Sequence, residues 1–125
     1  MEHRDFVKLR SPLTVRYKFV NAQGEKLSPT LFEGSTANLS AGGMLLAGRI
    51  PDPAWVVDLL TGRVWVALNL AIPGDAEPIK AVSKVAWIER MEPDLSVCPI
   101  GLVFEEIAAD DKNRIQRYVI RAQVV

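Results

Sequence analysis

The stretch Asn38-Leu39-Ser40-Ala41-Gly42-Gly43 combines small polar side chains with a pair of glycines, and it lies between two apolar, strand-like runs. An amide that donates and accepts, a hydroxyl, and a glycine that allows positive φ or close approach of the backbone together suit a polar ligand. Asn, Ser and Gly are also common turn residues, so the stretch taken alone favours a tight hairpin that binds nothing. The rest of the chain has to separate these two interpretations.

Apolar and polar residues alternate on both sides of this stretch, which predicts strands that are buried on one face. The predicted strand segments are 13–19, 31–38, 44–46, 64–72, 79–88 and 100–104. Within 79–88 we expect Ile79, Ala81, Val85 and Trp87 to share one face, which Ser83 interrupts. The segment 54–62, which follows two prolines, fits a short strand, a helical turn or a long connection.

The period of the apolar residues changes only near the C-terminus. Ile115, Tyr118, Val119 and Ala122 have the spacing of an amphipathic helix, and Asp110 or Asp111 can cap its start. Six strands followed by one helix predict a mainly β protein, namely a small six-stranded antiparallel β-barrel with a C-terminal α-helix. We expect the helix to cover an otherwise open part of the barrel.

Composition restricts the classes of partner. The chain has 125 residues, enough for one domain with a core, and its 15 basic and 15 acidic residues leave no net charge. Residues 1–18 nevertheless carry five basic and two acidic side chains, a local charge of +3 that suits a small anionic ligand. No aromatic run accompanies a basic groove, so the sequence predicts no nucleic-acid binding.

The residues required for catalysis or metal binding are scarce. His3 is the single histidine, Cys98 is the single cysteine, and neither belongs to a recognisable metal or nucleophile motif. We therefore expect no enzyme activity, no metal and no cofactor. The N-terminus lacks the apolar core of a signal peptide, and the longest apolar stretch is too short to span a bilayer. These features predict a cytoplasmic protein without direct membrane insertion.

Three motifs in order resemble the PilZ domain family. They are the basic pair Arg4 and Lys8 near the N-terminus, Asn38-x-Ser40-x-x-Gly43, and Gly101-Leu102-Val103-Phe104 before the predicted helix. The resemblance covers nearly the whole chain and implies one domain over 1–125. It divides the chain into a flexible N-terminal basic switch segment (1–12), a split barrel (13–107) and a helix (109–123).

The resemblance also implies a function, because the family is known for bacterial receptors of cyclic di-GMP. Its Arg-x-x-x-Arg and Asp/Asn-x-Ser-x-x-Gly motifs imply that Arg4, Lys8, Asn38, Ser40 and Gly43 contact the nucleotide. Lys8 departs from the arginine of the family motif: it keeps the charge but lacks the planar, forked guanidinium. Arg10 is a further candidate for that role, less favoured than Lys8.

The implied receptor binds without turnover and passes the signal to a protein partner by ordering the N-terminal segment. The alternative is a PilZ-like adaptor that binds a protein and has lost or weakened nucleotide binding. The expected oligomeric state is a monomer or a weak dimer. The number of nucleotides per site and the identity of the partner are open.

Overall fold

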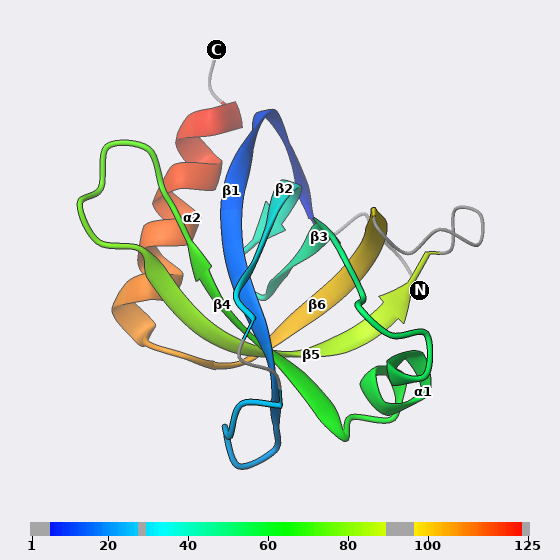
Figure 1. Ribbon diagram of the computed structural model, residues 1–125. Coiled ribbons are helices and arrows are strands. Elements are labelled where there is room, and N and C mark those ends of the chain that lie inside the picture. Colours follow the sequence, from blue (N-terminus) through cyan, green and yellow to red (C-terminus); the bar gives the residue numbers. More distant parts are fainter. Residues whose placement is uncertain (1–5, 28–29, 90–96, 124–125) are drawn as a thin grey trace.

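The computed structural model describes residues 6–27, 30–89 and 97–123. Within these ranges, every strand is antiparallel to its neighbours, and the sheet closes in the order β1-β2-β3-β6-β5-β4 (Figure 1). The elements are β1 (Val7–Asn21), β2 (Phe32–Ser40), β3 (Gly43–Gly48), α1 (Trp55–Leu60), β4 (Val64–Leu70), β5 (Ile79–Ile88), β6 (Cys98–Ile107) and α2 (Ala109–Gln123). The structure confirms the predicted six-stranded antiparallel barrel with a C-terminal helix.

Strand β1 begins earlier than the sequence predicts. We expected residues 1–12 to precede the barrel, yet β1 starts at Val7 and Lys8 pairs with Asn38 of β2. The register then shifts, because the next pair is Leu13 with Thr36. Ser11 and Pro12 lie in this irregularity, where the missing N–H of proline is tolerated. Figure 1 shows that β1 bends near its start, and Ser11 and Pro12 lie within the strand and do not mark its beginning.

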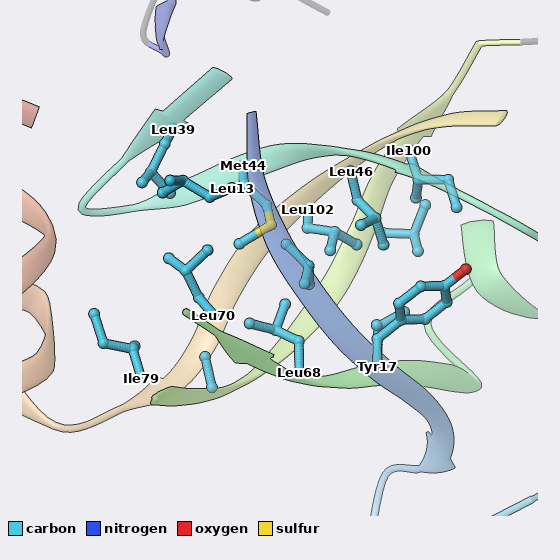
Figure 2. Packing of buried hydrophobic residues seen from close by; sticks show 14 of the residues in the cluster. Leu13, Tyr17, Leu39, Met44, Leu46, Leu68, Leu70, Ile79, Ile100 and Leu102 are labelled. Carbon is cyan, nitrogen blue, oxygen red and sulfur yellow. The ribbon is translucent and has the colours of Figure 1, made fainter. Parts of the chain in front are cut away.

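The core fills the barrel and extends under both helices. Figure 2 shows side chains from several strands meeting there, including Leu13, Leu39, Met44, Leu70 and Leu102. The two helices lie on opposite sides of the barrel (Figure 1): α2 packs against β1 and β2, and α1 against β4 and β5. Both Ile115 and Val119 are buried, as the helical spacing predicted, and the ambiguous segment 54–62 contains helix α1.

In β5, Ile79, Ala81 and Val85 are buried as expected, but the predicted orientation of Trp87 is wrong. The register of β5 with β6 shifts between Val85, which pairs with buried Leu102, and Trp87, which pairs with Gly101. Because this bulge adds one residue, Trp87 points to the outer face while Val85 points inward. Ser83 is buried as expected from its position, and its hydroxyl donates to the Val66 carbonyl at 2.9 Å.

Tyr17 is a large, fully buried side chain of the core, and its hydroxyl both accepts and donates a hydrogen bond. It accepts the N–H of Arg49 at 2.6 Å and donates to the Arg49 carbonyl at 3.3 Å. A Cβ on Gly48 would lie 2.8 Å from this hydroxyl, so the glycine leaves the space that the ring end needs. Burial raises the pKa of the Tyr17 hydroxyl above its ordinary value.

We expect Tyr17→Phe to lower the free energy of unfolding by about 1–3 kcal/mol, because the Arg49 N–H loses its acceptor. Urea denaturation measures this change. Tyr118→Phe is the control, since Tyr118 is half-buried and its hydroxyl has no hydrogen bond to the described residues. An equal loss of stability in both variants would contradict the role assigned to the Tyr17 hydroxyl.

Candidate functional site

A bulge in β2 decides which way the polar motif points. Thr36 and Leu39 are both buried although they are three positions apart along the chain, and a regular strand of period two would place them on opposite faces. The register with β3 shifts between Thr36 and Asn38, so Ala37 is the extra residue. Asn38 and Ser40 therefore lie on the outer face of the barrel.

The Thr36 hydroxyl holds this bulge. It accepts the Asn38 N–H at 3.3 Å and lies 3.0 Å from the Asn38 carbonyl and 2.8 Å from the Leu45 carbonyl. These contacts satisfy backbone groups that the interrupted ladder leaves unpaired. The Asn38 side-chain amide makes no hydrogen bond with the described residues, so its donors and acceptor face outward unused.

The strand registers place Asn38 in a row that crosses five consecutive strands of the barrel, with one residue from each. Lys8 pairs with Asn38, Asn38 with Leu45, Leu45 with Gly101, and Gly101 with Trp87. Directly opposed residues of an antiparallel pair project from the same face. We name these five residues the outer row; it carries a cation, a free amide, an apolar side chain, a glycine and an indole.

The motif also forms the hairpin between β2 and β3, so the turn interpretation is correct for its second half. Ser40 pairs with Gly43, and the Ser40 hydroxyl accepts the Gly42 N–H at 3.2 Å. The Gly42 carbonyl in turn accepts the Phe104 N–H at 2.9 Å, which ties the turn to β6. The proton of the Ser40 hydroxyl is still available to donate to a ligand.

Gly43 has a packing role that the sequence did not predict. Its φ is not positive, and a Cβ built on it would lie 2.1 Å from the Leu102 carbonyl oxygen. The backbones of β3 and β6 therefore approach too closely here for any side chain. A glycine is required at this position whether or not a ligand binds.

The predicted site residues divide into three groups. Asn38, Ser40 and Gly43 lie together on β2 and β3, and Lys8 stands directly beside Asn38. Arg10 is exposed on β1 but lies inside the register irregularity, with no strand partner of its own. Arg4 lies outside the described residues. No ion pair joins Lys8 or Arg10 to any residue of the described part.

The predicted site residues did not include three members of the outer row, although Gly101 belongs to one of the motifs identified in the sequence. Leu45 was taken only as part of a strand, and Trp87 was placed on the core face because the bulge in β5 leaves no mark in the alternation. A cavity of about 520 Å³ lies elsewhere on the surface, with Arg16, Lys18, Asn69 and Lys80 among its lining residues. None of the predicted site residues lines it.

These features define a small, closed β-barrel domain that carries the outer row on its surface. The sequence profile of the PilZ domain family matches residues 2–121, and the chain belongs to this family of cyclic di-GMP receptors. PilZ receptor domains are non-catalytic binding domains. Among curated proteins, none matches the chain.

Two solved structures share the fold. The inhibitor of motility MotI/DgrA from Bacillus subtilis superimposes with a TM-score of 0.67 at 20% sequence identity, over 99% of this chain and 53% of that chain. The chain thus spans about half the length of that protein. The PilZ domain with c-di-GMP of YcgR from Escherichia coli has a TM-score of 0.59 at 12% identity, over 94% of this chain and 88% of that chain. Among the described residues, no helix is long and apolar enough to cross a membrane.

Adjacent glycines of the hairpin provide a matched pair of variants. We expect Gly43→Ala to destabilise the barrel by about 1–3 kcal/mol, because its Cβ overlaps the β6 backbone. Gly42→Ala has little effect, since its Cβ meets only the Ser40 hydroxyl, at 3.9 Å. Thermal unfolding of both variants measures the difference. Equal melting temperatures would show that β3 and β6 do not need the close approach.

Proposed function

We propose that the protein is a cyclic di-GMP receptor that binds the nucleotide across the outer row. The observation that carries the proposal is the direct pairing of Lys8 with Asn38, which sets an unpaired cation beside an unpaired amide on an exposed face. Membership of the PilZ family supports this ligand, as does the likeness of the fold to the PilZ domain of YcgR with c-di-GMP.

Each polar group has a role that follows from its chemistry. The Asn38 amide both donates and accepts, which matches the edge of a guanine base, and the Ser40 hydroxyl donates a further hydrogen bond. Lys8 contributes a point charge to a phosphate. Arg4 supplies the planar guanidinium that can bond to two acceptors or stack on a base. Binding holds Arg4 and Lys8 over the nucleotide and so changes the surface offered to a protein partner.

The register favours Lys8 over Arg10 for the second basic position. Lys8 is the strand partner of Asn38, whereas Arg10 belongs to the irregular part of β1. If Arg10 acted instead, Arg10→Ala would weaken nucleotide binding more than Lys8→Ala. We expect the reverse order, measured by titration calorimetry with cyclic di-GMP.

Lys8→Arg introduces the forked guanidinium of the arginine that the family motif contains at this position. We expect cyclic di-GMP to bind this variant roughly tenfold to a hundredfold more tightly, the scale of one bidentate contact. Lys112→Arg, an exposed change on α2, is the control and leaves the affinity unchanged. Lower affinity in Lys8→Arg than in the unchanged protein would contradict a phosphate-facing or base-facing role for residue 8.

Asn38→Ala and Ser40→Ala test the other half of the site. Each removes a hydrogen bond to the nucleotide, so each weakens binding by roughly tenfold or more, with cyclic di-AMP and GTP as controls of specificity. No heat and no shift of the melting temperature in the unchanged protein at high cyclic di-GMP would reject the receptor proposal. The protein would then fit the adaptor alternative, and its partner binding would not respond to the nucleotide.

A further inference from the structure

The indole ring of Trp87 lies against the backbone at Gly101, where any side chain would collide with it. A Cβ on Gly101 would lie 2.3–2.4 Å from three atoms of the indole ring. The bulge in β5 turns Trp87 outward, and its strand partner Gly101 lets the ring rest on the β6 backbone. Trp87 is not part of the buried core, so its packing serves the outer face of the barrel.

Phe6, which lies near the N-terminus, stacks on this indole ring. The ring centroids are 5.8 Å apart and the ring planes differ by 20°, which is a stacked arrangement. Phe6 immediately precedes β1 and is half-buried, and it too lies outside the core. The contact therefore joins the start of β1 to β5 across the outer surface.

The stack is close to the candidate site. Gly101 is two strands from Asn38 along the outer row, a distance of about 10 Å at the usual spacing of strands. Phe6 stands two positions after Arg4 and two positions before Lys8. Two residues of chain span at most about 7 Å, so fixing Phe6 restricts where both basic side chains can reach.

We propose that the stack of Phe6 on Trp87 anchors the N-terminal basic segment to the barrel. Phe6 is a positioning residue: it holds the start of β1 so that Lys8 stays beside Asn38. The effect of this positioning on nucleotide binding rests on the proposed cyclic di-GMP site. The anchor itself does not, because the stack is a contact between two residues of this chain.

The test compares Phe6→Ala with the conservative Phe6→Tyr. We expect Phe6→Ala to weaken cyclic di-GMP binding about tenfold, whereas Phe6→Tyr, which keeps the ring, retains the affinity. Trp87→Leu weakens binding similarly, and the double variant adds little further loss, because both changes break the same contact. Binding by the unchanged protein and by Phe6→Ala with equal affinity would overturn the positioning role.

A second measurement needs no nucleotide. Trypsin cleaves after Lys8 only when the start of β1 detaches, so we expect cleavage there to be about tenfold faster in Phe6→Ala than in the unchanged protein or in Phe6→Tyr. Equal rates in all three would overturn the anchor. If the unchanged protein bound no nucleotide but cleavage accelerated as expected, the receptor proposal would fail while the anchor would stand.

Discussion

The core and the outer row both depend on the hydrogen bonds between the Thr36 hydroxyl and the backbone of β2 and β3. This hydroxyl stabilises the one-residue bulge of β2, and this bulge allows Thr36 and Leu39 to face inward while Asn38 and Ser40 face outward. A regular strand would put Asn38 on the same face as Thr36, inside an apolar barrel, where its amide would lack partners. A separate irregularity, in β1 between Lys8 and Leu13, brings Lys8 opposite Asn38. One buried hydrogen-bonding group thus separates the packing face of β2 from its outer face.

The fold was largely predictable because alternation survives in most strands. The segment 79–88 has the bounds of β5, and Ile115 and Val119 mark the buried stripe of α2. The errors occur where the backbone departs from a period of two. The bend at Ser11 and Pro12 concealed the beginning of β1, and the bulge after Val85 reversed the predicted orientation of Trp87. A bulge is a property of paired strands, so a single sequence gives little indication of it.

The sequence predicted some of the candidate residues but not their arrangement. The motif of Asn38, Ser40 and Gly43 was visible in the sequence, and the pairing of Lys8 with Asn38 emerges only from the register. Gly43 is explained by the nearby Leu102 carbonyl, a contact between strands far apart in the chain. The stack of Phe6 on Trp87 joins the first and fifth strands and has no local signal at all. Long-range contacts of this kind decide how a short motif is used.

The measurement that tests the central claim most directly is a nuclear magnetic resonance titration of the isotopically labelled protein with cyclic di-GMP. We expect saturable shifts of the backbone amides along the outer row, greatest at Lys8, Asn38 and Gly101, with the neighbouring Ser40 also affected. The amides that line the cavity near Arg16, Asn69 and Lys80 should stay unchanged. Shifts confined to that cavity, or no saturable shift anywhere, would contradict the assignment of the outer row as the nucleotide-binding face.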